Sequence, residues 1–484
     1  MLEKGEWPDC WRDHWITPLY KKKSVSDPGN YRGVHLIAVL SKSVERVIAE
    51  LLSKYLEASG AVDKNQWAFK VGHSCRDLVS LFTNTCILSL HAGHKTGVYL
   101  SDISGAFDRV SKTLLLEKLR AAGVSNEMLA FIDSYLQSRR STVIVGGAKS
   151  KEFKLEDTVF QGTVLGPKFW NVFFDDVSKA VPAEYQSKKF ADDLTCLKEF
   201  SKETSNEEIQ TDLKQCQAVV HEWGRQNQVI FDQAKEEFAI IHGIEGEGKD
   251  FRYLGTWMDT SLRMGTNIEK ILSRTRPKTK ALLRSQRFYN VLDMVRQYKT
   301  HILCHLECNS GGFYHALDTV LAPLENLQNH FLNGIGISVE EAFLEHNLAP
   351  LATRRDIAML GFIYKSVHEQ AHPDLQKLFP RQKLSEHRYD TRLQLHRHDL
   401  QLEEERPGTH HALLRRSVFG LARIWNRLPV EVVHAKIVTE MQKRLTAFVR
   451  VSCERQDGDW ANIFSPRPVL LRDHTFFEGL RGAD

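Results

Sequence analysis

The stretch Lys188-Lys189-Phe190-Ala191-Asp192-Asp193-Leu194-Thr195-Cys196-Leu197 carries two adjacent aspartates between two short apolar runs. This pattern predicts a strand, a tight turn and a second strand, with the acidic pair at the tip. Adjacent carboxylates repel each other unless cations neutralise them, and Mg²⁺ prefers one or two carboxylates together with substrate phosphates. Most Asp-Asp pairs are nevertheless solvated turns, so a metal site requires a further carboxylate elsewhere in the chain.

A second acidic position follows the run Gly97-Val98-Tyr99-Leu100-Ser101, which predicts a buried strand that delivers Asp102 at its end. We expect Asp102 and Asp192 to lie on two strands of one antiparallel sheet backed by helices, which is an α+β fold. The sequence leaves open whether those two strands are adjacent. Asp175-Asp176 is another acidic pair, but it continues a helical run, so we expect it to have a structural or surface role.

The composition narrows the class of protein. The chain has 484 residues, which suits two to four domains, and a net charge of +4, which is too mild to indicate a nucleic-acid partner by itself. Its eight cysteines include no Cys-x-x-Cys pair, so a disulfide framework and a zinc ribbon are disfavoured and a reducing compartment fits best. With no signal peptide and no long apolar run, we expect neither secretion nor a membrane span.

Apolar spacing and turn residues predict the other elements. The helix over residues 43–56 should bury a face of Val44, Val47, Ile48, Leu51 and Leu52. Further elements are a strand at 31–37, helices at 74–90, 111–121 and 125–138, a hairpin of 141–145 and 153–160 around Gly146-Gly147, helices at 161–180 and 204–227, and strands at 238–242 and 251–257. Residues 260–380 are predicted to be helical, and 381–411 to form a charged, His-rich linker or mobile segment. A packed pattern returns over Ser417–Pro429.

A basic stretch lies between Lys270 and Lys299, with nine Lys or Arg residues and a single acid, Asp293. A solvated helix face is the ordinary explanation for such a run, but this charge ratio favours contact with nucleic-acid phosphates. Lys280, Arg284 and Arg287 should share one helical face, and Phe288, Leu292 and Val295 another. Four nearby residues have helical spacing that could hold zinc, but we expect core and surface positions without a structural metal; they are His301, Cys304, His305 and Cys308.

Six ordered blocks resemble the reverse transcriptase of non-LTR (LINE-type) retrotransposons, over about Trp15 to Pro429. They are Asn30-Tyr31-Arg32-Gly33-Val34-His35-Leu36, Gln66-Trp67-Ala68-Phe69-Lys70-Val71-Gly72-His73-Ser74, Asp102-Ile103-Ser104-Gly105-Ala106-Phe107-Asp108, Phe160-Gln161-Gly162-Thr163-Val164-Leu165-Gly166-Pro167, Phe190-Ala191-Asp192-Asp193 and Tyr253-Leu254-Gly255-Thr256. Trp425-Asn426-x-Leu428-Pro429 is also similar to C-termini in parts of that family. The chain departs from the family pattern at Gly33, Ala68, Lys70, Lys168 and Trp170.

The resemblance implies a right-hand polymerase. Fingers would occupy residues 1–97 and an antiparallel-sheet palm 98–245, with a fingers-like insertion at about 111–160. A primer grip and helical thumb would occupy 246–380, and a linker with a helical C-terminal extension 381–484. No endonuclease, RNase H or Cys-Cys-His-Cys pattern is visible, and the sequence leaves open whether a nuclease lies upstream in a longer reading frame.

The function implied is an RNA-directed DNA polymerase that extends a DNA primer with dNTPs on an RNA template by two-metal phosphoryl transfer. One alternative is a catalytically silent RNA-binding remnant. Another is a palm polymerase that makes RNA, but Phe107 argues against it, because such an enzyme needs room for the 2′-hydroxyl. The resemblance implies the nucleus and cytoplasm as location, although no clear targeting signal is present. The oligomeric state, the host and the specific template stay open.

The resemblance also assigns site residues. Asp102, Asp192 and Asp193, with Ile103, would bind two Mg²⁺ ions, for which Mn²⁺ could substitute. The substrate-binding residues would be Arg32 at the triphosphate, Phe107 as a steric gate against the 2′-hydroxyl, Gln161 and Gly162 beneath nucleotide and template, and Lys235 near the leaving pyrophosphate. Nucleic acid would meet Lys280, Arg284, Arg287, Tyr253 and Gly255. Asp108 would cap the following helix or hold its loop. The ordinary alternative for Phe107 is a side chain of the hydrophobic core. The ordinary alternative for Arg32 is an exposed residue that binds no substrate.

Overall fold

The computed structural model of the chain describes residues 4–21, 24–155, 159–382, 398–404 and 406–468. These residues form two units of structure. Unit 1 comprises Met1–Val71, Gly97–Lys198 and Glu207–Phe238, and unit 2 comprises Gly72–Thr96, Glu199–Asn206 and Ala239–Asp484. The predicted division into fingers, palm, thumb and extension stays a prediction.

The acidic hairpin predicted from the sequence is present. Strands β7 (Gln186–Phe190) and β8 (Asp193–Phe200) pair antiparallel with Phe190 opposite Asp193, so Ala191-Asp192 is a two-residue turn. Two more strands, β3 (Lys95–Ser101) and β9 (Glu237–Ile241), complete a sheet in the order β7-β8-β3-β9. Asp102 follows β3 directly, and β3 and β8 are neighbours, which answers the question that the sequence left open.

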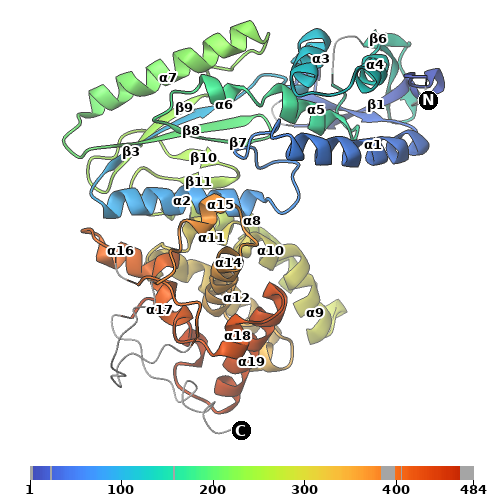
Figure 1. Cartoon of the computed structure of the whole chain (residues 1–484). Helices are drawn as coiled ribbons and strands as arrows, with labels where there is room; N and C mark the ends of the chain where they lie inside the picture. Colours follow the sequence, from blue (N-terminus) through green and yellow to red (C-terminus); the bar gives the residue numbers. More distant parts are fainter. Residues whose placement is uncertain (1–3, 22–23, 156–158, 383–397, 405, 469–484) are drawn as a thin grey trace. The chain divides into compact units, whose positions relative to one another are not determined.

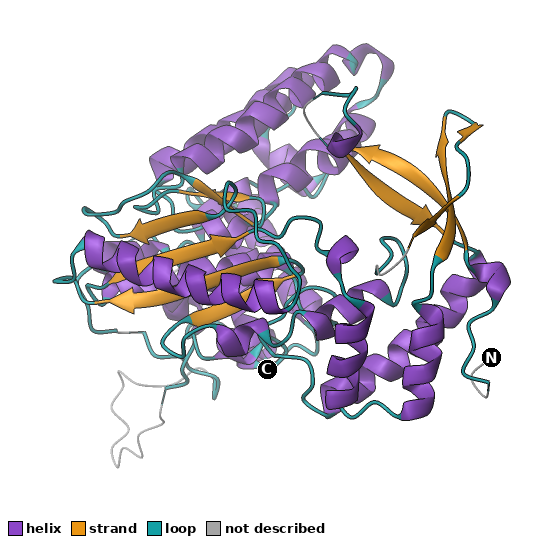
Figure 2. Cartoon of the chain, turned by 90° about the horizontal axis from the view of Figure 1, so that it is seen from above, coloured by secondary structure: helices purple, strands orange, loops and turns teal. Residues whose placement is uncertain are grey.

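Helix α7 (Asn206–Gln226) covers one face of this sheet (Figures 1 and 2). Its buried side chains recur every three or four residues and so form one stripe. They are Ile209, Leu213, Cys216, Val220 and Trp223. The helix predicted over residues 204–227 is therefore confirmed, and the mixture of helices and antiparallel strands confirms the α+β class.

A second sheet in unit 1 has the strand order β2-β1-β4-β5, with β6 also paired to β4. The strands are β1 (Asp13–Tyr20), β2 (Tyr31–Leu36), β4 (Arg139–Val145), β5 (Ala148–Lys149) and β6 (Phe153–Leu155). Strand β1 is antiparallel to β2 and parallel to β4, and Gly146-Gly147 forms the predicted turn of the β4–β5 hairpin. The predicted strand 153–160 is described only in part, because residues 156–158 lie outside the described residues.

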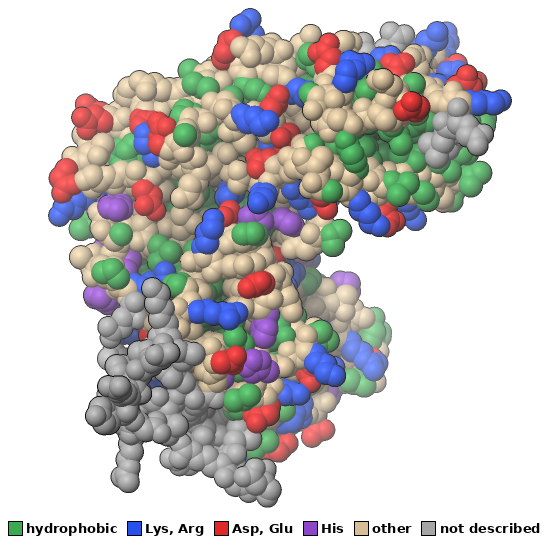
Figure 3. All heavy atoms as spheres, viewed as in Figure 1, with side chains coloured by type: hydrophobic (Ala, Val, Ile, Leu, Met, Phe, Trp, Pro, Cys, Tyr) green, Lys and Arg blue, Asp and Glu red, His purple; other side chains and the backbone are tan. Residues whose placement is uncertain are grey.

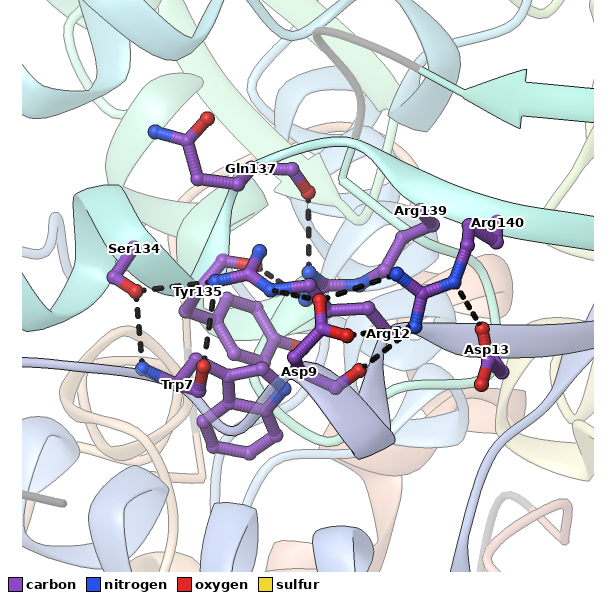
Figure 4. A network of polar contacts seen from close by, with 9 residues as sticks. All are labelled: Trp7, Asp9, Arg12, Asp13, Ser134, Tyr135, Gln137, Arg139 and Arg140. Carbon is purple, nitrogen blue, oxygen red and sulfur yellow. Dashed lines mark hydrogen bonds and ion pairs between the residues drawn. The ribbon is translucent and has the colours of Figure 1, made fainter.

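The segment before β1 is held against helix α4 (Asn126–Tyr135) and strand β4 by a polar network (Figure 4). The Trp7 amide donates to Ser134 Oγ at 3.0 Å, and the Arg12 guanidinium donates to the same oxygen at 3.2 Å. Arg140 on β4 donates to both carboxylate oxygens of Asp9 at 3.1 Å. The Trp7 side chain is only 3% exposed, so this segment is part of the core of unit 1.

The remaining helices of unit 1 begin and end largely as predicted. They are α1 (Val39–Ala58), α3 (Lys112–Ala121), α4 (Asn126–Tyr135), α5 (Gly166–Phe173) and α6 (Val177–Ala180). Ser111 and Ser125 cap α3 and α4 by accepting a backbone hydrogen bond. The single helix predicted over residues 161–180 is wrong, because residues 161–165 form a turn and the rest divides into α5 and α6.

The buried face predicted for α1 is also partly wrong. Val47 and Leu51 are each 60% exposed, whereas Glu45 is 1% exposed and Ile48 2%. Hydrophobic side chains gather on the surface where α1 lies (Figure 3). Apolar spacing identified the helix but not which of its two apolar stripes is covered.

Unit 2 contains the hairpin of β10 (Phe251–Tyr253) and β11 (Thr256–Met258) and is otherwise mainly helical, as predicted for residues 260–380. Its helices are α2 (Cys75–His91), α8 (Gly265–Arg284), α9 (Val291–Tyr298), α10 (Cys304–Glu307), α11 (Ser310–Phe313), α12 (Asp318–Ile335), α13 (Val339–Leu344), α14 (Leu351–Val367), α15 (Pro373–Gln376), α16 (His411–Arg416), α17 (Ala422–Trp425), α18 (Val430–Val433) and α19 (Val438–Glu454). Helix α11 meets α2 through Gly312, where an added Cβ would lie 2.6 Å from Val79. That close approach requires glycine.

Trp425 and Asn426 fasten the segment 398–404 to the core of unit 2. The Trp425 indole donates to the Leu400 carbonyl at 2.7 Å, and the Asn426 side chain bonds both the amide and the carbonyl of Leu402. Residues 383–397 and 405 of the predicted linker lie outside the described residues. The segment 398–404 is packed rather than linker-like, because these main-chain bonds give it a fixed partner.

Among the described helices, none has both the length and the apolar character needed to cross a membrane. All eight cysteines are free thiols.

Candidate active site

One cavity in unit 1, about 760 Å³ in volume, collects eight of the residues that the sequence blocks singled out. They are Arg32, Asp102, Ile103, Phe107, Gln161, Gly162, Asp192 and Lys235. Lys21, Asn30 and Asp108 also line it. Segments that lie far apart in the sequence therefore meet at one place.

The backbone that follows the Asp102 side chain is hydrogen-bonded on both sides of Ile103. The Asp232 amide donates to the Asp102 carbonyl at 2.8 Å, and the Ser104 amide donates to the Ile230 carbonyl at 3.0 Å. Ile103, between them, forms a β-bridge with Phe231. The position of the Asp102 carboxylate thus depends on the segment 230–232 as well as on β3.

Lys235 lies beside that carboxylate. Its Nζ is 3.0 Å from Asp102 Oδ1 and 2.6 Å from Asp232 Oδ2. The hydrogen bond to Asp232, followed by that to Asp102, raises the pKa of Lys235, so the side chain is an ammonium ion. Lys235 therefore partly neutralises the carboxylate of Asp102. Because the Lys235 side chain is about half exposed, it is able to change its partner.

Asp192 is the second residue of the β7–β8 turn. Burial raises the pKa of its carboxyl, and the negative charge of Asp102 raises it further, while Arg32 and Lys235 oppose the shift. The two carboxylates are thus close enough to repel each other, and a divalent cation between them would remove that repulsion.

The donors at this place suit a hard divalent cation. The described residues hold no group of three His, Cys, Asp or Glu side chains suited to a metal ion. Mg²⁺, however, needs only one or two carboxylates when phosphates complete its coordination. The Asp102 and Asp192 carboxylates, with the carbonyl of the cavity-lining Ile103, supply such a set.

Asp193 does not join them. It is exposed, begins β8 and is not among the residues that line the cavity. The assignment of Asp193 to the metal site stays a prediction.

Gln161 and Gly162 line the cavity and lie against strand β2. The His35 amide donates to the Gln161 carbonyl at 2.9 Å. Gly162 has φ +101°, and an added Cβ would lie 2.6 Å from the His35 carbonyl oxygen. The close backbone approach that glycine permits here is to β2.

Glu45 is a buried residue that sequence reasoning missed. Its carboxylate accepts from the amides of Val164 at 2.7 Å and Leu165 at 3.2 Å, just before α5 begins. A carboxylate at this place satisfies otherwise unpaired amides and favours the helix dipole. Helix α1 thereby fixes the loop that follows Gly162. The only sign of this role in the sequence is that Glu45 is a charged residue among the apolar positions of the helix.

Asp108 lines the cavity from the short 3-10 turn η3 (Phe107–Arg109). It does not cap the next helix, because Ser111 does so. Partial burial raises the pKa of Asp108, and a hydrogen bond with Gln161 opposes that shift. Of the two roles predicted for Asp108, the structure supports the holding of the loop.

The pair Asp175-Asp176 is structural, as expected. Asp176 Oδ1 accepts from Lys118 at 2.8 Å and from the Trp223 indole at 3.0 Å. The Asp63 amide donates to Asp175. Both carboxylates therefore have protein partners away from the cavity.

The comparisons agree with this geometry. Residues 20–258 match the family described as reverse transcriptase (RNA-dependent DNA polymerase). Residues 20–258 are a reverse transcriptase domain. The RNA-directed DNA polymerase from mobile element jockey of Drosophila funebris is 26% identical over 322 residues, which cover 62% of this chain and 35% of that protein. The probable RNA-directed DNA polymerase from transposon X-element of Drosophila melanogaster is 28% identical over 191 residues, covering 39% of this chain and 21% of that protein.

The chain thus spans about a third or less of the length of these curated relatives. Among solved structures, apo telomerase from Candida tropicalis matches with a TM-score of 0.41 and 12% identity, over 77% of this chain and 64% of that chain. The predicted resemblance to the reverse transcriptases of non-LTR retrotransposons is confirmed by the family match and by these relatives.

Beyond the reverse transcriptase domain, α8 in unit 2 carries part of the predicted nucleic-acid surface. Lys280 and Arg284 lie on α8, but Arg287 lies beyond its end, in the 3-10 turn η4 (Gln286–Phe288). The single helical face predicted for these three cations is wrong, because α8 ends at Arg284. Phe288 is 69% exposed whereas Val295 is 1% exposed, so the predicted apolar face is divided as well.

The predicted primer-grip residues differ from each other in exposure. Tyr253 is 3% exposed and packs on Phe82, with ring centroids 4.4 Å apart. Its side chain is therefore a core residue of unit 2. Gly255 is exposed at the β10–β11 turn, where φ is +90°. The contact of Tyr253 and Gly255 with nucleic acid stays a prediction.

Replacing Gly162 by Ala should impair both folding and any activity of the cavity. The added Cβ would meet the His35 carbonyl at 2.6 Å, in a backbone conformation that L-residues rarely adopt. We expect the free energy of unfolding to fall by about 2–4 kcal/mol, measured by urea denaturation.

Gly60→Ala is the matched control. Gly60 also has positive φ, at +68°, but nothing lies within 4 Å of an added Cβ. The free energy of unfolding of the Gly60→Ala variant should fall by only about 1 kcal/mol, because of backbone strain. If the free energy of unfolding fell equally in Gly162→Ala and Gly60→Ala, the contact with β2 would not constrain residue 162.

Proposed function

We propose that this chain is an RNA-directed DNA polymerase that extends a DNA primer with dNTPs on an RNA template. The observation that carries the proposal is the meeting of Asp102 and Asp192 in one cavity with Arg32, Phe107 and Lys235. The curated relatives named above are RNA-directed DNA polymerases, which supports the same reaction.

Two Mg²⁺ ions would be held by the carboxylates of Asp102 and Asp192 and by the Ile103 carbonyl, with Mn²⁺ as a possible substitute. When bound, the ions supply stabilisation of the attacking and leaving oxygens of the phosphoryl transfer. Lys235, released from Asp102 by this neutralisation, would turn toward the leaving pyrophosphate as an ammonium ion able to donate a proton.

The other cavity residues would place the nucleotide. Arg32 on β2 and Lys21 at the end of β1 bring two cations to the cavity, where they would hold the triphosphate. The Phe107 ring is half-buried and would occupy the place of a ribose 2′-hydroxyl, which favours deoxyribonucleotides by steric exclusion. Nucleic-acid phosphates would meet the cations of α8, and an intracellular location in the nucleus and cytoplasm would fit this role.

Replacing Asp102 or Asp192 by Asn should abolish primer extension on an RNA template. Each change removes a charge that holds the metal ions, and we expect the rate to fall by about 1,000-fold or more. The rate of dNTP incorporation in Mg²⁺ measures this, and chelation of Mg²⁺ should have the same effect on the wild type.

Asp133→Asn serves as the control, because Asp133 is a surface residue of α4 that pairs with Lys112. It should extend the primer at the wild-type rate. Wild-type rates in the Asp192 variant would refute the assigned ligand. No extension by any protein, with tight RNA binding retained, would favour the silent RNA-binding remnant instead.

Replacing Phe107 by Val should admit ribonucleotides, because the smaller side chain leaves room for the 2′-hydroxyl. We expect the ratio of kcat/KM for dNTP over rNTP to fall by about 10-fold or more. Phe107→Tyr keeps the aromatic wall and should keep the ratio. An unchanged ratio in the Val variant would end the gate assignment.

Replacing Lys280, Arg284 and Arg287 together by Gln should weaken binding of template–primer duplex and make it less sensitive to salt. Removal of one phosphate-binding cation lowers the slope of log K against log salt concentration by about 0.7–0.9. Fluorescence anisotropy at several salt concentrations measures the slope, which should fall by about 2 to 3 in total.

The control removes three exposed cations elsewhere in unit 2, namely Lys377, Lys443 and Arg455. These changes leave the same net charge as the α8 variant. An equal drop in slope for both variants would mean that net charge, not the α8 surface, determines binding.

A further inference from the structure

The turn that carries Asp192 has a strained backbone. Ala191 has φ +58°, in the left-handed region that favours glycine. An alanine in this conformation costs about 1–2 kcal/mol. Because Ala191 precedes Asp192 directly, its conformation sets the direction in which the Asp192 side chain leaves the turn. The strain persists only if neighbouring groups hold the turn.

Gln66 is the first of these groups. The Ala191 amide donates to Gln66 Oε1 at 3.1 Å, and Gln66 Nε2 donates to the Ala191 carbonyl at 3.3 Å. One side-chain amide thus bonds both main-chain groups of the strained residue. Gln66 is 1% exposed, and its Oε1 also accepts from the Ala68 amide at 2.9 Å, so its orientation is fixed.

The segment around Gln66 is itself joined to β7. The Trp67 amide donates to the Lys189 carbonyl at 2.9 Å, and the Lys189 amide donates to the Asn65 carbonyl at 2.8 Å. These bonds form a parallel bridge between Gln66 and Lys189. The Gln66 amide is therefore held in register with the hairpin whose tip it binds.

Trp170 is the second group. Its indole Nε1 donates to the same Ala191 carbonyl at 2.9 Å, and the side chain is fully buried. Its ring also stacks on Phe107, with centroids 5.8 Å apart and planes 19° from parallel. One indole therefore contacts the turn before Asp192 and the back of Phe107.

We propose that Gln66 and Trp170 are positioning residues that hold Ala191 in its left-handed conformation and so direct the Asp192 carboxylate into the cavity. Trp170 in addition supports the Phe107 ring from behind. This inference rests on the proposed polymerase function for its effect on catalysis. A displacement of a ligand by about 1 Å costs on the order of 100-fold in rate, so such supports matter although neither side chain touches substrate.

The test compares Gln66→Leu, Gln66→Glu and Trp170→Phe with the wild type in single-nucleotide extension. Gln66→Leu removes both bonds to Ala191, Gln66→Glu keeps only the acceptor, and Trp170→Phe keeps the ring but removes the donor. We expect kcat to fall by about 10- to 100-fold for Gln66→Leu and less for the other two, with a KM for dNTP that changes by less than about 3-fold. Trp170→Leu, which also removes the stacking, should lower the preference for dNTP over rNTP as well.

Trp223→Phe is the matched control. Trp223 is another buried indole of unit 1 that donates a hydrogen bond to a side chain away from the turn, Asp176 at 3.0 Å. Its variant should keep the wild-type kcat. Thermal unfolding of all variants separates loss of positioning from loss of folded protein.

A rescue variant identifies the strained turn as the point of action. Glycine reaches positive φ without the cost of a Cβ. Adding Ala191→Gly to Gln66→Leu should therefore restore part of the kcat, whereas Ala191→Gly in the wild-type background should give no gain. A stably folded Gln66→Leu variant with wild-type kcat, or a double variant without recovery, would overturn the proposal.

Mn²⁺ affinity provides a readout that does not depend on polymerisation. Titration by electron paramagnetic resonance without nucleic acid should show about 3- to 10-fold weaker binding in Gln66→Leu, and no change in Trp223→Phe. If the wild type extends no primer but this difference in Mn²⁺ affinity is found, the positioning stands and the polymerase proposal fails. If the wild type extends primers and neither measurement changes in the variants, the positioning fails alone.

Discussion

The carboxylates of Asp102 and Asp192 line one cavity, and the repulsion between them is a constraint that the residues around this site have to meet. Like charges brought together inside a protein destabilise it unless they are compensated, and burial of Asp192 adds to this cost. The fold compensates only in part. Lys235 bonds Asp102, and Arg32 contributes positive charge from β2. Under the proposed function, a divalent cation between the two carboxylates would remove the remaining repulsion.

Three side chains that do not line the cavity hold this unfavourable arrangement in place. They do so by hydrogen bonds to main-chain groups. Glu45 fixes the loop after Gly162 through the amides of Val164 and Leu165. Gln66 and Trp170 fix the turn before Asp192 through the backbone of Ala191. All three side chains are almost fully buried, so water does not compete for these bonds.

The sequence predicted those parts of the site that depend on local pattern. The short apolar runs on either side of Asp192 and the apolar run before Asp102 are short-range signals, and the three strands that they predict are present as β7, β8 and β3. The pairing of β3 with β8 could not be predicted, because it joins segments about a hundred residues apart. Gln66 was missed as a support for the same reason, because its bond to Ala191 spans 125 residues. Trp170 lies only 21 residues from Ala191, but its indole comes from a helix, and the sequence does not show that this side chain reaches the turn. Asp193 is exposed at the start of β8 and does not line the cavity, because a doublet in the sequence does not determine where each of its side chains lies.

Errors on helices have a different physical origin. Apolar spacing showed that α1 is amphipathic, but it carries two apolar stripes, and only the rest of the fold decides which is covered. The cations near 280–287 were assigned to one face because the sequence shows no strong breaker, yet α8 ends at Arg284 and Arg287 lies on a separate turn. The Trp425-Asn426 pair was recognised as packed, whereas its partner, the segment 398–404, lies in a stretch whose composition resembles a linker.

Strand β1 has a practical consequence for anyone who would cut this protein into pieces. The family match begins at Tyr20, which is the last residue of β1. Strand β1 bonds β2 on one side and β4 on the other. A fragment trimmed to residues 20–258 would therefore lack the middle of a sheet and leave two open strand edges, which invite aggregation. A soluble fragment of this unit needs to start ahead of Trp7, upstream of the region that the family signature marks.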